Sequence, residues 1–320
     1  GVLPAAAWPA RRRLIAGGAV ALGALGLLLP APDPVAMSAG LGNRPTAEAL
    51  ADVRLRRVRV LFQADGLTGR IALWERPPNQ LSFRMDGIPN ASFSAEDILT
   101  QASMAHVPAA LCPSPRRALV VGLGMGSTAG SLTLHREIAE LHVVELNPAQ
   151  PKLVAHLAPY TYDVLRDPRT RLHLDDARHY LLTEREGFDL ISSDPTNLYV
   201  SGMVTLYTRE WFELVKRRLN PGGVFLQWLH FYQLEDADLK GVLRTFQEVF
   251  PHASAWMHFE GEAFLVATAE PLRLDPAAWE KRLAGPAVAA DLARGRLESA
   301  GALLGLFLWD AADLQRFAAG

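Results

Sequence analysis

The sequence predicts an α/β protein in which a small antiparallel β-domain precedes a mostly parallel sheet with an antiparallel end. Two patterns carry this prediction. Residues 54–93 alternate apolar and polar side chains between turn sequences such as DG and PPN, which is typical of short antiparallel strands. Beyond Arg117, apolar runs alternate with helix-length segments, which is typical of βαβ units around a parallel sheet.

The first part of the chain differs in composition from the rest. Residues 11–29 place three arginines before an apolar run of about 16 residues, slightly short for a membrane span. The run fits an export signal, a short anchor helix or the last span of a longer membrane region. We expect a membrane-associated protein whose catalytic domain lies in the cytoplasm. Export stays an alternative, because the arginines alone favour the opposite orientation.

Four units are expected along the chain. Residues 1–51 form the membrane- or signal-like segment and a linker, and residues 52–110 form the small β-domain and a connecting helix. Residues 111–272 form the nucleotide-binding domain, and residues 273–320 form a helical extension. Strands of the large sheet are expected at residues 118–124, 140–147, 171–176, 188–194, 222–229, 253–259 and 263–269, the last two as an antiparallel pair. Helices are expected at residues 95–110, 127–137, 148–158, 177–184, 208–218 and 235–249.

Charge and residue spacing exclude several kinds of site. The net charge of −2 gives no basic face for a nucleic acid. The only cysteine, Cys112, excludes an internal disulfide. The nine histidines include no HxH or HExxH pair, so no metal site is expected.

Residues 118–130, ALVVGLGMGSTAG, read as a strand, a glycine-rich turn and the start of a helix. In an open parallel sheet, ligands bind beyond the carboxyl ends of the strands, where the strand order reverses. Gly122, Gly124 and Gly126 let the backbone approach a ligand, and the helix N-terminus offers free N–H groups. The turn alone fits a structural role equally well.

Acidic residues end the three strands that follow the turn. Glu145 is placed to accept hydrogen bonds from ribose hydroxyls, and Asp176 from an adenine amino group. Asp194 ends the fourth strand and precedes a loop long enough to act as a lid. So many carboxylates favour an adenosyl-sulfonium ligand over a pyrophosphate. A solvated loop position or a helix cap remains an alternative for Asp175 and Asp176.

From about residue 55 to 270 the chain resembles the spermidine synthase family, the polyamine aminopropyltransferases, and most of all its membrane-fused, spermidine-synthase-like branch. The resemblance implies a Rossmann-like, methyltransferase-type domain after the small β-domain. The matching stretches are TQASMAHVPAALCPSPRRALVVGLGMGSTAG, VVELNP, DPRTRLHLDDAR, FDLISSDPTNLYVSGMVTLYTREWF and RRLNPGGVFLQWLHFY.

The resemblance assigns roles to the residues of the nucleotide pocket. It implies that Gly122, Gly124 and Gly126 line the pocket, that Glu145 holds the ribose, and that Asp176 with Ala177 receives the adenine. Asp194 matches the first acid of the family's DSSD lid motif.

Three positions depart from the family pattern. Met125 stands where the aspartate of the GGGDG turn holds the donor's aminopropyl chain. Asn197 stands where the second lid aspartate accepts the proton of the attacking amine, and an asparagine is no base. Thr100 falls near a tyrosine that contacts the amine.

These departures leave the catalytic residues open. Asp194 is a candidate substitute base, and Asn197 and Tyr199 complete the candidate catalytic set. Tyr199, Tyr207 and Trp228 would wall a channel for an amine's methylene chain, although core packing is the favoured role of Trp228. Further candidate substrate residues are Gln101, Tyr207, Glu235 and Asp236.

The first interpretation of the function is a transferase that moves an aminopropyl group from decarboxylated S-adenosylmethionine, or from S-adenosylmethionine, to a polyamine or other amine without a metal. An S-adenosylmethionine-dependent methyltransferase and a catalytically inactive nucleotide- or polyamine-binding domain stay open. An NAD-dependent dehydrogenase is disfavoured, because no His, Lys and Tyr set follows the fifth strand. Family members commonly pair, so a homodimer is a further expectation.

Overall fold

The structure is a computed structural model that describes Val35 and residues 57–67, 69–195, 202–232, 234–259 and 261–319. The apolar segment at residues 11–29 lies outside these residues. Within them, no helix is long and apolar enough to cross a membrane.

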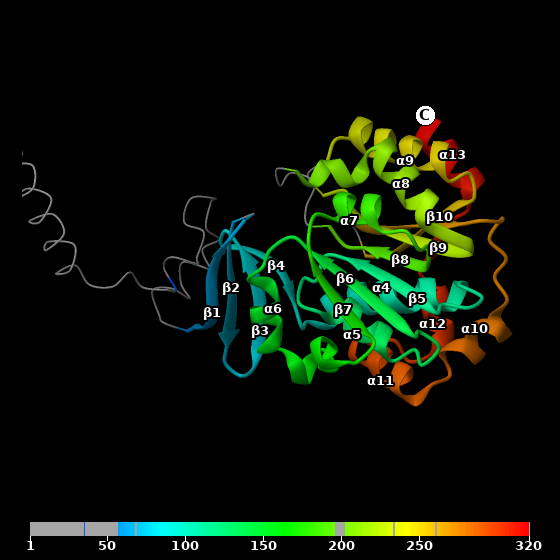
Figure 1. The fold of residues 1–320 in the computed structure, drawn as a ribbon. Helices are drawn as coiled ribbons and strands as arrows, with labels where there is room; N and C mark the ends of the chain where they lie inside the picture. Colours follow the sequence, from blue (N-terminus) through cyan, green and yellow to red (C-terminus); the bar gives the residue numbers. More distant parts are fainter. Residues whose placement is uncertain are drawn as a thin grey trace, which may run out of the picture.

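The first unit is a four-stranded antiparallel sheet with strands in chain order. Its strands are β1 (Arg59–Gly66), β2 (Gly69–Arg76), β3 (Gln80–Met85) and β4 (Ile88–Ser92). Ile71, Leu73 and Phe83 on one face of the sheet are buried in the same apolar cluster as Val120 and Leu153 of the larger unit. This shared core fixes the small sheet against the larger unit, and the two lie side by side (Figure 1).

The second unit is built on an eight-stranded sheet of order β12-β10-β11-β9-β8-β5-β6-β7. Its strands are β5 (Arg117–Val121), β6 (Glu140–Glu145), β7 (Thr170–Leu174), β8 (Phe188–Ser193), β9 (Leu219–His230), β10 (Ala253–Phe259), β11 (Glu262–Thr268) and β12 (Phe307–Trp309). Strands β5 to β9 run parallel, while β11 pairs antiparallel with β9 and with β10. The predicted parallel sheet with an antiparallel end is confirmed.

Helices cover both faces of this sheet (Figure 1). On one side lie α7 (Ala177–Thr183), α8 (Arg209–Arg218), α9 (Asp236–Val249) and α13 (Ala311–Ala319). On the other lie α4 (Ala95–Leu111), α5 (Ser127–Thr133), α10 (Pro276–Leu283), α11 (Pro286–Arg294) and α12 (Ala300–Leu304). The shorter α6 (Gln150–Ala155), η2 (Ala158–Tyr160), η3 (Val164–Arg166) and η4 (Met203–Tyr207) lie in the connections.

The C-terminal extension is only partly helical. Besides α10 to α13 it contributes β12, which pairs antiparallel with β10 and becomes the edge strand of the large sheet. The sequence predicted helices for this extension and did not indicate β12, because three residues are too few to show a strand pattern.

The strand order places the ligand crevice. From β5 the chain continues to β6 and β7 on one side of the sheet, and returns to β8 and β9 on the other. The connection that follows β5 therefore leads to one side and the connection that follows β8 leads to the other, which opens a crevice at the carboxyl ends of β5 and β8.

Candidate active site

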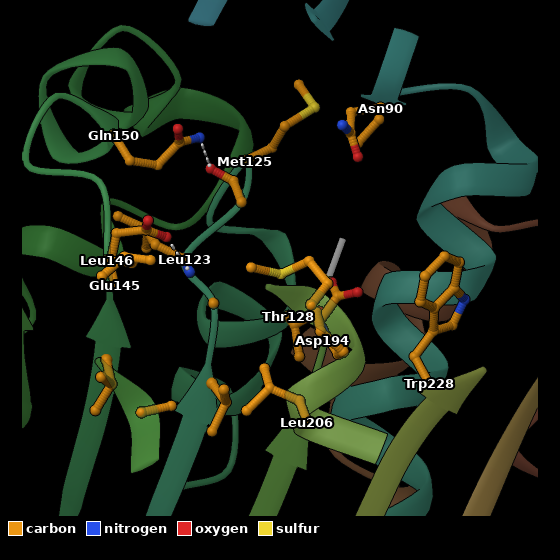
Figure 2. A pocket seen from close by; sticks show the side chains of 18 of the residues that line it. Asn90, Leu123, Met125, Thr128, Glu145, Leu146, Gln150, Asp194, Leu206 and Trp228 are labelled. Carbon is orange, nitrogen blue, oxygen red and sulfur yellow. Dashed lines mark hydrogen bonds between the residues drawn. The ribbon is translucent and has the colours of Figure 1, made fainter. Parts of the chain in front are cut away.

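A cavity of about 460 Å³ lies at this crevice, which is a usual size for a small-molecule site. It runs from the ends of β6 and β7, past the glycine turn and Asp194, to Trp228 on β9 and Glu262 on β11. The N-terminal part of α4 and the small β-domain close it from the remaining side. Residues from both units therefore build one site (Figure 2).

The glycine turn is held tightly against the end of β8. Gly122, Gly124 and Gly126 have φ angles of 92°, 52° and 83°, which favour glycine. The N–H group of Gly122 donates to the Val144 carbonyl at 2.9 Å. A Cβ atom on Gly122 would lie 2.8 Å from the Asp194 carbonyl oxygen. Gly122 thus allows the turn and Asp194 to lie side by side.

This contact predicts the effect of Gly122→Ala. We expect a loss of about 2–4 kcal/mol in the free energy of unfolding, because backbone strain and a clash with Asp194 add together. Gly124→Ala is the matched control, since its φ is also positive but no atom lies within 4 Å of the added Cβ. The control should lose about 1 kcal/mol. Urea unfolding measures both values, and equal losses would contradict the proposed clash.

Glu145 is fixed by the backbone that surrounds it. Its Oε2 accepts the N–H of Leu123 at 2.9 Å (Figure 2). Its Oε1 accepts the N–H of Asn147 at 2.7 Å. Burial raises the pKa of Glu145, and the backbone N–H groups oppose this rise. The carboxylate is therefore held rigidly at the end of β6, where it lines the cavity.

Gln150 supports the same turn and was not identified from the sequence. It is only 2% exposed, and its Nε2 donates to the Gly124 carbonyl at 2.5 Å (Figure 2). No motif indicates this contact, because it depends on how α6 packs beside the turn.

Asp176 both caps a helix and lines the cavity. Its Oδ1 accepts the N–H groups of Arg178 and His179 at 2.9 and 3.0 Å, which starts α7. Its Oδ2 accepts no hydrogen bond from the described residues and remains available to a ligand. Ala177 also lines the cavity, as does Asp175, which pairs with His179 at 2.7 Å. The two alternatives for Asp176, cap or ligand-facing acid, are therefore compatible.

Asp194 lies in the middle of the cavity wall, between the glycine turn and Trp228 (Figure 2). Its main-chain N–H donates to the Val121 carbonyl at 3.0 Å, which extends the pairing of β8 with β5. Among the described residues, none forms a hydrogen bond with its side chain. Burial raises the pKa of Asp194 to about 7, and repulsion from Glu262 adds to the rise. The negative charge of Asp194 is therefore unfavourable in the cavity, and binding of a proton or a cation would stabilise it.

The end of the cavity beyond Asp194 is lined by Asp97, Thr100, Gln101, Trp228 and Glu262. The indole N–H of Trp228 donates to Glu262 Oε2 at 3.1 Å. Of these residues, Asp97 and Glu262 were not predicted from the sequence. Glu262 pairs with His230 at the end of β9, so antiparallel β11 begins at the edge of the sheet where β9 ends. An acid at the start of a strand that pairs antiparallel with the last parallel strand is therefore a sign of a site residue.

The other predicted residues fall in different places. Met125 lines the cavity and is 2% exposed, with its side chain in the core cluster shared by the two units. Tyr207 is not among the described lining residues, because its ring is buried and its hydroxyl donates to the Trp228 carbonyl at 2.8 Å. Glu235 and Asp236 are exposed at the start of α9 and are likewise absent from the described lining. Asn197 and Tyr199 lie outside the described residues.

The cavity has a strong charge bias. Its described lining contains six carboxylates and no Lys, Arg or His. The six are Asp97, Glu145, Asp175, Asp176, Asp194 and Glu262. In the described part of the chain, no group of three or more His, Cys, Asp or Glu side chains is arranged to hold a metal ion. The arrangement favours an organic cation with several hydrogen-bond donors.

Comparisons with known proteins agree with this geometry. Residues 98–259 match the spermine/spermidine synthase domain. The chain is 32% identical over 170 residues to a polyamine aminopropyltransferase of Aeropyrum pernix, covering 52% of this chain and 54% of that protein. It is 25% identical to a polyamine aminopropyltransferase of Nitrosomonas europaea over 79% of each chain.

Solved structures show the same fold. A spermidine synthase in complex with the transition-state analogue AdoDATO superposes with a TM-score of 0.64 and 22% identity, covering 73% of this chain and 88% of that one. The first of the two sequence matches spans only about half of its relative, but the domain match covers half of this chain and includes the glycine turn, Glu145, Asp176 and Asp194. The chain therefore belongs to the spermine/spermidine synthase family.

Proposed function

We propose that the protein transfers an aminopropyl group from decarboxylated S-adenosylmethionine to an amine. The observation that carries this proposal is the cavity lined by six carboxylates and, in its described part, by no cationic side chain. The donor is a sulfonium with an ammonium tail, and the acceptor is an amine, so both substrates bring positive charge to a negative site.

The donor's nucleoside would bind at the β6 and β7 end of the cavity. Glu145 would accept the ribose hydroxyls, and the free Oδ2 of Asp176 would accept the adenine amino group. The sulfonium group would then lie beyond the glycine turn, beside Asp194.

The two possible donors differ in charge, because only one of them carries a carboxylate. S-adenosylmethionine carries an α-carboxylate that would enter a cavity already lined by carboxylates. Two like charges 4 Å apart repel by about 4 kcal/mol at the effective dielectric typical of a protein surface. Decarboxylated S-adenosylmethionine lacks that charge, so we propose it as the donor.

The reaction needs one base. The amine nitrogen attacks the carbon next to the sulfonium sulfur, and the new C–N bond forms as the C–S bond breaks. The bonding electrons remain on sulfur, which leaves as the thioether of methylthioadenosine. We propose that Asp194 takes the proton that the amine loses, because Asn197 cannot.

The substitution at Met125 weakens one contact. A carboxylate at this position would form a charge-assisted bond to the donor's ammonium, worth about 1.5–3 kcal/mol. The apolar side chain of Met125 cannot form it. Asp194, which has no hydrogen-bond partner among the described residues, is placed to offset this loss.

Product analysis tests the proposal. The full chain is incubated with either donor and a pool of diamines and polyamines, and the products are identified by mass spectrometry. We expect methylthioadenosine and an aminopropylated amine from the decarboxylated donor. With S-adenosylmethionine, whose transferred chain keeps its carboxylate, methylthioadenosine should form at least about tenfold more slowly. Adenosylhomocysteine would instead indicate a methyltransferase. Bound nucleotide without either product would indicate a binding domain that has lost catalysis.

A further inference from the structure

The short element η4 forms part of the cavity wall near the end where the donor's nucleoside would bind. Met203, Thr205 and Leu206 of η4 line the cavity. Leu206 packs in the same apolar cluster as Val144 and Ala177, which line the nucleoside end. A 3₁₀-helix of five residues has poor hydrogen-bond geometry and little stability of its own. The shape of this wall therefore depends on the contacts that hold η4 in place.

Arg178 of α7 supplies the main polar contact to η4 from another element. Its Nη1 donates to the Thr205 carbonyl at 2.9 Å and to the Thr208 hydroxyl at 3.2 Å. Because the donor is charged, these bonds are stronger than bonds between neutral groups. Thr208 in turn caps α8, since its hydroxyl accepts the N–H of Trp211 at 3.3 Å. Arg178 therefore fixes the junction between η4 and α8.

The main chain of Arg178 is fixed at the nucleoside end as well. Asp176 Oδ1 accepts its N–H at 2.9 Å, and Asp176 and Ala177 both line the cavity. Arg178 thus connects two parts of the wall, the acid proposed for the adenine through its main chain and η4 through its side chain. Arg178 itself is half-buried and is not among the described lining residues. It would therefore act on a ligand through Asp176 and Thr205.

The C-terminal end of η4 has a separate attachment. The hydroxyl of Tyr207 donates to the Trp228 carbonyl at 2.8 Å, and the Tyr207 side chain is buried in the apolar core. Loss of the Arg178 bonds would therefore release Thr205 while Tyr207 stays attached to β9. We expect the effect of such a loss to be confined to the nucleoside end of the cavity.

We propose that Arg178 is a positioning residue for the donor, whose guanidinium holds Thr205 and Leu206 of η4 against the donor's nucleoside. This inference rests on the proposed aminopropyl transfer, and it adds to the donor site a residue that does not touch the donor. A wall that is fixed before the donor arrives need not be ordered on binding, so less of the binding energy is lost. Arg178 therefore contributes to the affinity for the donor rather than to the chemical step.

The test removes these hydrogen bonds and keeps the apolar part of the side chain. In Arg178→Met, we expect the KM of the donor and the Kd of methylthioadenosine to rise about 5- to 30-fold, because two charge-assisted bonds are lost. The KM of the amine and kcat at saturating donor should change by less than about threefold. Arg178→Lys can still donate to the Thr205 carbonyl and should recover part of the affinity for the donor. The matched control is Arg185→Met, an exposed arginine just beyond α7, which should behave as wild type.

The outcomes separate this inference from the function on which it rests. If wild type is active and Arg178→Met keeps the wild-type KM of the donor, the assignment of Arg178 is wrong. It is also wrong if kcat falls and both KM values rise together, because a general loss of structure has that effect.

If wild type binds methylthioadenosine but forms no product with either donor, the proposed transfer is wrong. In that case, calorimetric titration of methylthioadenosine decides the role of Arg178. Weaker binding to Arg178→Met than to Arg185→Met would support the role, and equal binding would overturn it. If wild type neither forms product nor binds methylthioadenosine, the transfer and the role of Arg178 are both wrong.

Discussion

Asp194→Asn is expected to lower kcat by about 10²- to 10⁴-fold, the usual loss when a positioned general base is removed. The amide has the same shape as the carboxylate but cannot accept the proton of the attacking amine. Stopped assays of methylthioadenosine formation at saturating donor and amine measure the effect. Asp238→Asn, an exposed acid on α9, is the control and should retain wild-type kcat. An unchanged kcat in Asp194→Asn would show that another group accepts the proton.

The pH profile gives a second test of the same assignment. Asp194 must be ionised to act as a base, and its pKa is raised to about 7 in the free protein. We therefore expect kcat/KM to fall as pH falls below about 7. The midpoint of kcat should lie lower, because a bound cation favours the ionised carboxylate. Asp194→Asn should lack this acidic limb.

The same substitution should stabilise the folded protein. A carboxyl whose folded pKa lies above its unfolded value of 3.8 loses stability as pH rises from 3.8 to about 7. The full shift corresponds to at most about 4 kcal/mol, and partial solvent access reduces it to about 1–3 kcal/mol. Urea unfolding should show Asp194→Asn to be more stable than wild type at pH 8, with the difference shrinking toward pH 4. If Asp194→Asn were less stable than wild type at pH 8, the ionised Asp194 carboxylate would not destabilise the folded protein.

The fold was predictable because its signals are local. Apolar runs such as residues 118–121 and 188–193 belong to buried parallel strands, and the glycine turn marks the start of the first βα unit. The structure ends several predicted strands and helices earlier, as at α5, which stops at Thr133 rather than near residue 137. The short β12 was missed, because its three residues form a strand only through pairing with β10.

The site was predictable at one end and not at the other. Glu145, Asp176 and Asp194 end or follow successive parallel strands, so topology alone brings them to one edge of the sheet. Asp97 and Glu262 come from a helix and an antiparallel strand, far apart in the sequence. Their meeting depends on how α4 packs on the sheet. Tyr207 shows the same limit, since its side chain points into the core rather than the cavity.

A buried polar network fixes the C-terminal extension to the rest of the protein. Asp291 on α11 is 1% exposed, and its Oδ2 accepts bonds from Ser131 at 2.5 Å and His106 at 3.0 Å. Its Oδ1 accepts bonds from Tyr162 at 2.7 Å and Arg294 at 2.9 Å. One carboxylate thus satisfies groups on α4, α5, α11 and the segment after η2.

Asp291→Ala is expected to lower the free energy of unfolding by about 3–5 kcal/mol, because it leaves buried His106 and Ser131 without their acceptor. The control is Glu298→Ala, an exposed acid of the same extension, which should change stability by less than about 0.5 kcal/mol. Urea unfolding at pH 7 measures both. A loss below about 1 kcal/mol in Asp291→Ala would mean that the extension is held by its apolar contacts alone.

The pH dependence distinguishes the charge of the Asp291 carboxylate from the packing of the carboxyl group, both of which Ala removes. Burial alone would raise the pKa of Asp291, but its bonds from His106, Ser131 and Tyr162 hold it at about 2. Because this value lies below the unfolded 3.8, the charge stabilises the fold above pH 3.8 and the benefit is lost as pH falls toward 2. The stability difference between wild type and Asp291→Ala should therefore narrow over that range by about 2 kcal/mol. A difference that stays constant from pH 7 to pH 2 would assign the loss to packing, since the packing lost with the side chain does not depend on its ionisation.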